Sequence, residues 1–189
     1  MKKLRDFLKN KKGLTGLETA IILIAFVIVA SAFAFTVLNM GILSAQRSKE
    51  VIGTGMAEAS SVLELDGSVI ANSTNNQVEY VIFYIKTSAG KHPVDLSPNT
   101  ATISYTSPHT HQDNVYDNKT TAFIYQVKGD GDALLEYGEK FKVVMDVSKF
   151  DTNLAANDKF TIEVKPPVGA VLSVERYLPP ALDTVMDLT

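Results

Sequence analysis

The most restrictive feature of this sequence is an uncharged apolar run of nineteen residues from Ala20 to Leu38, AIILIAFVIVASAFAFTVL. The run contains neither glycine nor proline, and on a helix its apolar side chains would cover every face. Nineteen residues at about 1.5 Å each span roughly 28 Å, close to the roughly 30 Å hydrocarbon thickness of a bilayer. The run therefore predicts a helix that can cross a membrane, or that other apolar surfaces must cover.

The helical pattern extends on both sides of this run, from Leu14 to about Ser61. After Leu38, apolar residues recur at steps of three and four while polar and charged residues fill the other faces. The sequence therefore predicts one long helix that is apolar all round in its first half and amphipathic in its second.

From Asp66 onward the pattern changes to the period of two that is typical of β-strands. Turn residues such as Asp66-Gly67 and Pro166-Pro167 separate the candidate strands. The candidates are Val78–Lys86, Ala101–Tyr105, Thr121–Val127, Phe141–Val147, Lys159–Val164 and Ala170–Arg176. Because no helix is expected between them, they predict an α+β chain: a long N-terminal α-helix followed by an antiparallel immunoglobulin-like β-sandwich.

Charge is segregated along the chain. Residues 1–13 hold six basic residues and one acidic residue, a net charge of +5; since the whole chain carries −3, the remainder carries −8. An acidic body argues against nucleic acid as a partner. Basic residues stay on the cytoplasmic side of a membrane, so the β-rich part is expected outside the cell. Cysteine is absent, which excludes disulfides, thiolate metal sites and a cysteine nucleophile.

Two interpretations of the N-terminus treat the apolar run as a conventional targeting segment. A common secretory signal peptide would be cleaved near Ala30-Ser31-Ala32 or Ala32-Phe33-Ala34, but the apolar run continues through both triplets. An uncleaved anchor explains the basic residues and the apolar length. It leaves the carboxylate of Glu18 beside the bilayer, at a cost of up to about 2.5–3.5 kcal/mol if the group sits deep.

A third interpretation uses the whole stretch KKGLTGLE. Cleavage after Gly13, behind Lys11 and Lys12, would leave the entire apolar helix on a mature chain that begins with a new α-amino group at Leu14. Glu18 would then be the fifth residue of that chain.

These residues resemble the class III signal peptide of type IV pilin-like proteins. Together with the following LTGLETAIILIAFVIVASAFAFTVLNMG and QRSKEVIGTG, they make the chain similar to an archaeal flagellin, or archaellin. The resemblance continues over Ala59–Val69 and Asn157–Val171, whereas residues 85–140 resemble the family only loosely.

The resemblance implies a structural subunit of the archaellum, the archaeal motility filament. A prepilin-peptidase-like enzyme would remove residues 1–13, residues 14–63 would form the filament core, and residues 66–189 would form the outer β-sandwich. A membrane-inserted precursor would become part of an extracellular helical homopolymer, with other archaellins as further candidate partners. Heterologous contacts that do not close into a ring build such a filament.

Two other functions remain open at this point. An archaeal type IV adhesion pilin would share the leader and the helix. A membrane-tethered extracellular binding module would use the β-sandwich to capture a ligand.

Glu18 acquires a specific role through the resemblance. In related pilins a matching glutamate is proposed to pair with a neighbouring N-terminal amine, which implies that Glu18 attracts the amino group of an incoming Leu14. Such pairing offsets the cost of a charge in a medium of low dielectric constant. Alternatively, a carboxylate in the first helical turn complements the helix dipole, worth about 0.3–1 kcal/mol.

Two sequons, Asn72-Ser73-Thr74 and Asn118-Lys119-Thr120, make Asn72 and Asn118 candidates for N-glycosylation in outward loops. Archaellins as a family are commonly glycosylated, which favours modification.

Two weak patterns suggest a metal ion. His109 and His111 form a His-x-His pair, and Asp130 and Asp132 form a cluster of oxygen ligands with Glu136 and Glu139. A solvated loop and a polar hairpin are the simpler interpretations. The sequence contains no catalytic motif, so we expect neither an enzyme nor a cofactor.

Overall fold

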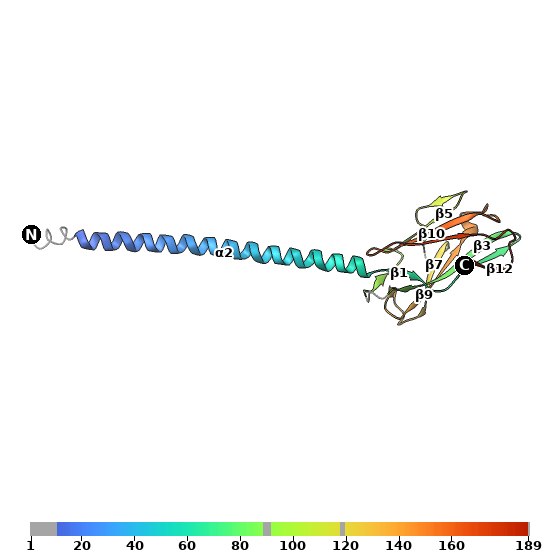
Figure 1. Cartoon of the computed structure of the whole chain (residues 1–189), viewed down its shortest axis with the longest axis horizontal. Coiled ribbons are helices and arrows are strands. Elements are labelled where there is room, and N and C mark those ends of the chain that lie inside the picture. Colours follow the sequence, from blue (N-terminus) through green and yellow to red (C-terminus); the bar gives the residue numbers. More distant parts are fainter. Residues whose placement is uncertain (1–10, 89–91, 118–119, 189) are drawn as a thin grey trace, which may run out of the picture. The chain divides into compact units, whose positions relative to one another are not determined.

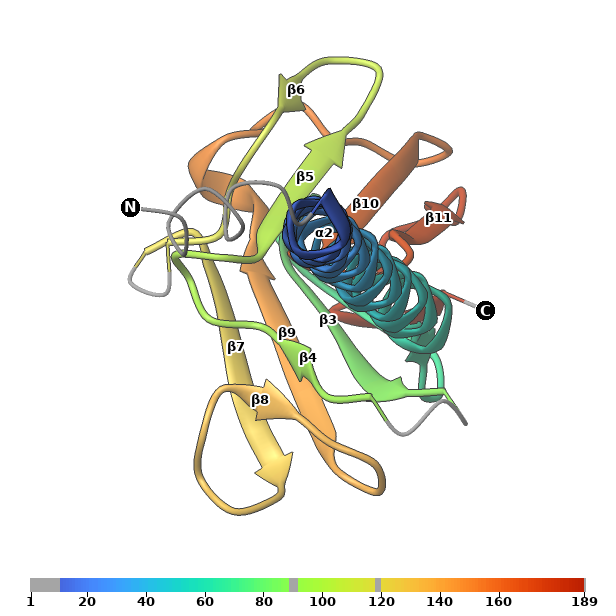
Figure 2. The same cartoon turned by 90° about the vertical axis from the view of Figure 1, so that its left-hand side faces the viewer.

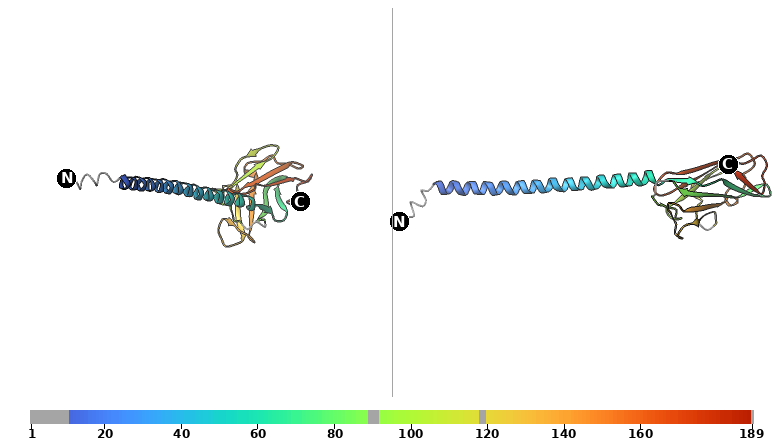
Figure 3. Two further views of the ribbon diagram at one scale, coloured as in Figure 1. Left: turned by 60° about the vertical axis from the view of Figure 1, so that its left-hand side comes forward. Right: turned by 60° about the horizontal axis from the view of Figure 1, so that its bottom comes forward.

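The computed structural model describes residues 11–88, 92–117 and 120–188, with side chains from residue 16 onward. The chain divides into two compact units, residues 1–52 and residues 53–189. The first holds most of one long helix, α2 (Lys11–Ser60), which is continuous in every view (Figure 3). Among the described residues, α2 is the one helix whose length and composition would allow it to cross a membrane.

The second unit, called here the β-unit, is built from antiparallel strands. The strands are β1 (Leu63–Leu65), β2 (Val69–Thr74), β3 (Gln77–Thr87), β4 (Val94–Asp95), β5 (Thr102–Thr106), β6 (His111–Gln112), β7 (Ala122–Lys128), β8 (Leu134–Leu135), β9 (Lys140–Asp146), β10 (Lys159–Lys165), β11 (Leu172–Tyr177) and β12 (Val185–Leu188). A short 3-10 helix, η1 (Val147–Lys149), follows β9. Figure 1 shows β5 and β10 in the upper part of this unit and β9 in the lower part.

The strands form two main sheets. A six-stranded sheet has the order β12-β2-β3-β9-β7, with β1 also paired to β3, and a four-stranded sheet has the order β11-β10-β5-β6. A small third sheet pairs β4 with β8. In Figure 2, β3, β9 and β7 run side by side, and so do β5 and β10.

One hydrophobic core joins the two main sheets. Alternate residues of β3 and β9, such as Phe83 and Val143, share this core with Tyr105 of β5 and Phe160 of β10. The Tyr105 hydroxyl donates a hydrogen bond to the buried carboxylate of Asp151 at 3.0 Å, so the polar end of this ring is satisfied inside the core. These contacts confirm a helix followed by packed antiparallel sheets.

The helix ends three residues before the predicted boundary at residue 63. Leu63 is buried and belongs to β1, and the Ser61 carbonyl accepts a hydrogen bond from the Ala170 amide at 3.1 Å. Gly169 makes this close approach sterically accessible, because a Cβ there would lie 1.9 Å from the Ser61 oxygen. Residues 61–63 therefore bond to the sheets instead of continuing the helix.

Candidate assembly surface

Helix α2 exposes its apolar side chains within the single chain. Phe26 is 70% exposed, Val29 67% and Phe33 71%, and all the described residues from Gly16 to Met56 are exposed. Fully burying one such side chain stabilises a protein by roughly 1.5–3 kcal/mol. A long helix with this surface is stable in water only when lipid or other chains cover it.

The hydroxyl groups inside the apolar run are satisfied by the helix itself. The Ser31 Oγ donates to the Val27 carbonyl at 2.5 Å, and the Thr36 Oγ1 donates to the Ala32 carbonyl at 2.9 Å. Because each hydroxyl bonds the carbonyl four residues earlier, neither needs a partner outside the helix. The run therefore behaves as an apolar surface despite these two polar side chains.

Glu18 is an exposed carboxylate just before the apolar run, and the next charged residue along α2 is Arg47. Leu14 lies one helical turn before Glu18, at the i, i+4 spacing that places two positions on the same side of a helix. The backbone of Lys11, Lys12 and Gly13 is helical as well, but the side chains of residues 11–15 lie outside the described part. The structure thus places Glu18 and Leu14 on one helix face.

The two histidines of the His-x-His pair are held by different partners. His109 Nε2 lies 3.1 Å from a carboxylate oxygen of Asp158, whereas His111 Nε2 lies 3.0 Å from that of Asp113. The His111 Nδ1 also lies 2.8 Å from the Thr106 hydroxyl. The geometry therefore favours two separate polar contacts over a shared metal site.

The acidic hairpin between β7 and β9 brings together three of the four carboxylates in the predicted group and leaves out Asp132. Asp130, Glu136 and Glu139 offer oxygens within 4.8 Å of one another, whereas the Asp132 carboxylate accepts the Leu134 amide at 2.9 Å instead. The Glu139 carboxylate accepts the backbone amides of Asp130 at 3.2 Å and Glu136 at 3.0 Å. The Glu139 carboxylate therefore holds the two ends of the hairpin loop together.

Comparisons with known proteins agree on one family. The model of the archaeal-type flagellin family matches residues 13–176. The chain belongs to the archaeal-type flagellin family. It is 41% identical to a probable flagellin 1 of Aeropyrum pernix, over 94% of this chain and 97% of the relative. It is 36% identical to a probable flagellin 1 of Archaeoglobus fulgidus, over 96% of this chain and 97% of the relative.

Solved structures agree with this assignment. The archaeal flagellum of Methanospirillum hungatei is similar with a TM-score of 0.71 at 30% identity, over 92% of this chain and 98% of that one. The flagellin FlaB1 of Methanocaldococcus jannaschii shares the fold, with a TM-score of 0.58 at 14% identity over 68% of this chain and 96% of that one. The chain is a structural subunit of the archaellum and belongs to an extracellular filament, and its family is one of filament subunits rather than enzymes.

The first candidate glycosylation site of this flagellin is in a strand, not in the predicted loop. Asn72 lies in β2, paired with Val185 of β12 and with Tyr80 of β3, and its side chain is half-buried. The hydroxyl of Thr74, at the end of the same sequon, donates to the Glu79 carboxylate at 2.8 Å. The prediction of a loop failed here because pairing on both sides converts a polar segment into a central strand.

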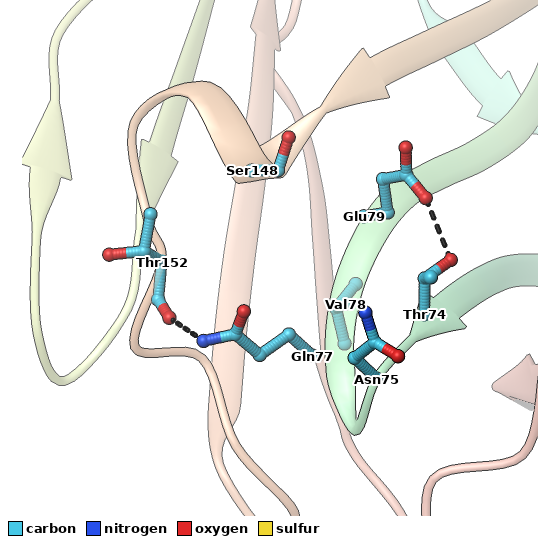
Figure 4. A pocket seen from close by; sticks show the side chains of 7 residues that line it. All are labelled: Thr74, Asn75, Gln77, Val78, Glu79, Ser148 and Thr152. Atoms are coloured by element: carbon cyan, nitrogen blue, oxygen red, sulfur yellow. Dashed lines mark hydrogen bonds between the residues drawn. The ribbon is translucent and has the colours of Figure 1, made fainter.

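Thr74 and Glu79 also line a shallow polar hollow of about 220 Å³ (Figure 4). On its other wall, the Gln77 side chain donates to the Thr152 carbonyl at 2.7 Å. The second candidate, Asn118, lies outside the described residues. Glycosylation at either asparagine stays a prediction.

Proposed function

We infer that this flagellin polymerises through α2, with helices from many copies packed together as the filament core and the β-units as its outer layer. The observation that carries this proposal is the apolar surface of α2, exposed from Leu17 through the run to Leu43. Each large side chain that neighbouring helices bury contributes roughly 1.5–3 kcal/mol, whereas an exposed ion pair contributes about 0–1 kcal/mol. Several such side chains in each copy outweigh any polar contact at the same interface.

The proposal includes removal of residues 1–13 by a prepilin-peptidase-like enzyme, with cleavage between Gly13 and Leu14. The sequence Lys11-Lys12-Gly13 directly before the apolar helix supports this position. The backbone on both sides of this bond is helical, so cleavage requires local unwinding of α2. The lysines at 11 and 12 would hold the precursor on the cytoplasmic side until then.

Before assembly, the same apolar surface would be covered by lipid. The length and composition of α2 suit a membrane-inserted precursor, and its internally bonded hydroxyls suit both lipid and packed helices. Exchange of lipid for neighbouring helices leaves the run away from water at every stage. Other archaellins can join the same core if they carry the same helix.

Glu18 is proposed to select the axial position of an incoming subunit. Cleavage would create a positive amino group on Leu14, and the carboxylate of Glu18 in a neighbouring copy would attract it. Between Glu18 and Arg47, α2 carries no other charge that could compete for this pairing.

Mass spectrometry of purified filaments tests the processing step. A mature N-terminus at Leu14 supports the proposal, whereas Met1 would support an uncleaved anchor, and Ser31, Phe33 or Phe35 an ordinary secreted protein. Swimming of a strain that lacks this chain then separates a motility filament from an adhesion pilus.

The Glu18 pairing needs its own test. Glu18→Gln should reduce incorporation into filaments at least about tenfold, as expected for the loss of a pairing worth more than about 1.4 kcal/mol. Glu58→Gln removes a carboxylate from the far end of α2 and serves as the matched control. Equal incorporation of both variants would leave Glu18 with a local helix-dipole role.

A further inference from the structure

The two main sheets of the β-unit differ in the chemistry of their outer faces. In each sheet, alternate residues point into the shared core, so the residues between them form the opposite face. On the six-stranded sheet this opposite face is rich in apolar and aromatic side chains. On the four-stranded sheet it is rich in threonines and charged groups.

The outer face of the six-stranded sheet carries two cross-strand rows. Cα pairing places Ile70, Ile82, Val144 and Phe123 in one row across β2, β3, β9 and β7. The next row contains Tyr84, Lys142 and Tyr125. Ile70, Ile82, Val144, Phe123, Tyr84 and Tyr125 are called the apolar face here. Tyr125 is exposed, and the other five are half-buried.

The four-stranded sheet provides a built-in contrast. Its outer residues on β5, β10 and β11 include Thr106, Thr161 and Glu175 in one row. Lys159 and Lys165 form ion pairs with Glu175 and Glu163 on this face, at 3.3 Å and 2.9 Å. Such a face is satisfied in water, whereas the apolar face presents a continuous row of half-buried hydrophobic side chains to solvent.

The size of the apolar face limits what can cover it. Neighbouring strands lie about 4.8 Å apart and the rows about 7 Å apart, which gives an area of about 300 Å² with the side chains included. A stable interface between free proteins buries about 800 Å² on each partner. The apolar face is therefore too small to hold a freely diffusing protein by itself. A neighbouring copy that is already attached through another surface can be held by an area this small, because its effective concentration is high.

The charges of the face point to an acidic neighbour. Lys142 lies between two tyrosines, and within the described residues no carboxylate lies within ion-pair distance of it. The remainder of this chain beyond residue 13 carries a net charge of −8, so another copy offers more carboxylates than basic groups.

We propose that the apolar face of one flagellin is covered by the β-unit of a neighbouring copy in the filament, with a carboxylate of that copy opposite Lys142, while the polar face of the four-stranded sheet stays in water. The inference rests on the proposed function, since polymerisation through α2 supplies the attached neighbour. It adds a second contact between copies, separate from the helical core.

Single-cysteine labelling of purified filaments tests this arrangement, and the natural chain has no cysteine to interfere. Ile82→Cys places a thiol at the centre of the apolar face, and Thr161→Cys is the matched control in the middle strand of the other sheet. Each labelling rate with a hydrophilic maleimide is divided by the rate of the same variant unfolded in guanidinium chloride. We expect Ile82→Cys to be protected at least about tenfold more than Thr161→Cys, because an interface excludes the reagent.

Equal protection of the two thiols would overturn the inference, and so would stronger protection of Thr161→Cys. Asn72 lies on the same outer face, two residues from Ile70, so labelling is repeated in Asn72→Gln filaments. Protection that persists supports a neighbouring copy, whereas protection that disappears would assign the cover to a glycan on this chain. If the Thr161→Cys chain folded but formed no filaments, the polar face would itself be a contact between copies, and the inference would be overturned while assembly through α2 was left untouched. Absence of filaments in the natural chain would instead contradict the proposed function.

Discussion

Helix α2 and the β-unit handle apolar surface in opposite ways. The β-unit buries its large side chains within one chain: Phe83, Tyr105 and Phe160 have no exposed area. Helix α2 exposes Phe26 and Phe33 by about as much as any large hydrophobic residue among the described ones. The β-unit can therefore reach its fold alone, whereas the apolar surface of α2 requires lipid or further copies of the chain.

The polar groups follow the same division. In the described residues of both units, every buried side-chain nitrogen or oxygen has a hydrogen-bond partner. The β-unit uses contacts between distant segments, such as Ser73 Oγ to the Asp183 carbonyl at 2.7 Å. Helix α2 uses bonds within a single turn. Mutations should therefore separate folding of the β-unit from assembly of the filament.

The largest effect is expected from a charge in the middle of the apolar run. Ile28→Lys should abolish filaments, because one lysine at the centre of an apolar segment costs about 2.5–3.5 kcal/mol in a membrane and cannot be paired in a core of apolar helices. Electron microscopy of filaments measures the loss, and Ile28→Leu is the control of similar size. Thermal unfolding of the β-unit should not change; a lower unfolding temperature would contradict the separation of the two regions.

The complementary change lies in the core of the β-unit. Phe83→Ala should lower the free energy of unfolding by about 3–5 kcal/mol, through lost burial and a residual cavity. Denaturant unfolding of the full chain in detergent measures this value. Tyr137→Ala, at a side chain that is 68% exposed, should stay within about 0.5 kcal/mol of the natural chain. Equal losses for the two variants would show that the core does not hold the β-unit together.

An alkaline pH series should weaken the β-unit by a smaller amount. Burial of Tyr116, whose hydroxyl donates to the Leu96 carbonyl at 2.7 Å, raises the pKa of Tyr116 to about 12. The unfolded chain loses this proton near pH 10 and the folded chain near pH 12, so the stabilisation is present below pH 10 and is lost as pH rises between these values. The loss should be on the order of 2 kcal/mol by pH 12. Tyr116→Phe should reduce the slope of the unfolding free energy against pH. An unchanged slope would show that ionisation of Tyr116 does not cause the loss of stability.

The smallest effect is expected on the acid side, at Asp66. Hydrogen bonds from Lys140 and Lys86 lower the pKa of the Asp66 carboxyl, and Lys86 Nζ lies 3.2 Å from it. The folded chain therefore keeps this carboxylate to lower pH than the unfolded chain does. The resulting stability is present above the unfolded pKa and is lost as pH falls through the folded pKa. Unfolding temperatures of Asp66→Asn and the natural chain should converge on acidification, and a constant difference would contradict this pairing.

Much of this division was predictable from the sequence, because its causes are local. The apolar run determines where α2 forms. The sequence predicts a helix from Leu14 to about Ser61, and α2 spans Lys11–Ser60. Alternating residues set the long strands, so β3, β9 and β10 lie within two residues of their predicted ends.

Elements stabilised by distant partners were harder to predict. Strand β2, with the sequence VIANST, looks like a loop until β3 and β12 pair with it. The sequence contains one local signal for this strand, the pair Asn75-Asn76 that follows it. Both residues adopt positive φ, at 54° and 64°, which a two-residue hairpin turn requires and which asparagine tolerates. The partner of His109 is also distant, since Asp158 lies 49 residues further along the chain, whereas the partner of His111, Asp113, is a local one. The absence of Asp132 from the acidic group depends on how the hairpin closes, because its carboxylate accepts the Leu134 amide instead.

Hydrogen exchange on intact filaments tests the central claim most directly, because it reads α2 and the β-unit in one sample. An isolated helix is marginal in water and exchanges quickly, whereas a helix packed among its copies is protected. We predict that backbone amides between Thr19 and Gln46 exchange in filaments as slowly as those of β3 and β9. Exchange of the α2 amides as fast as those of the exposed loop at residues 130–133 would contradict assembly through this helix.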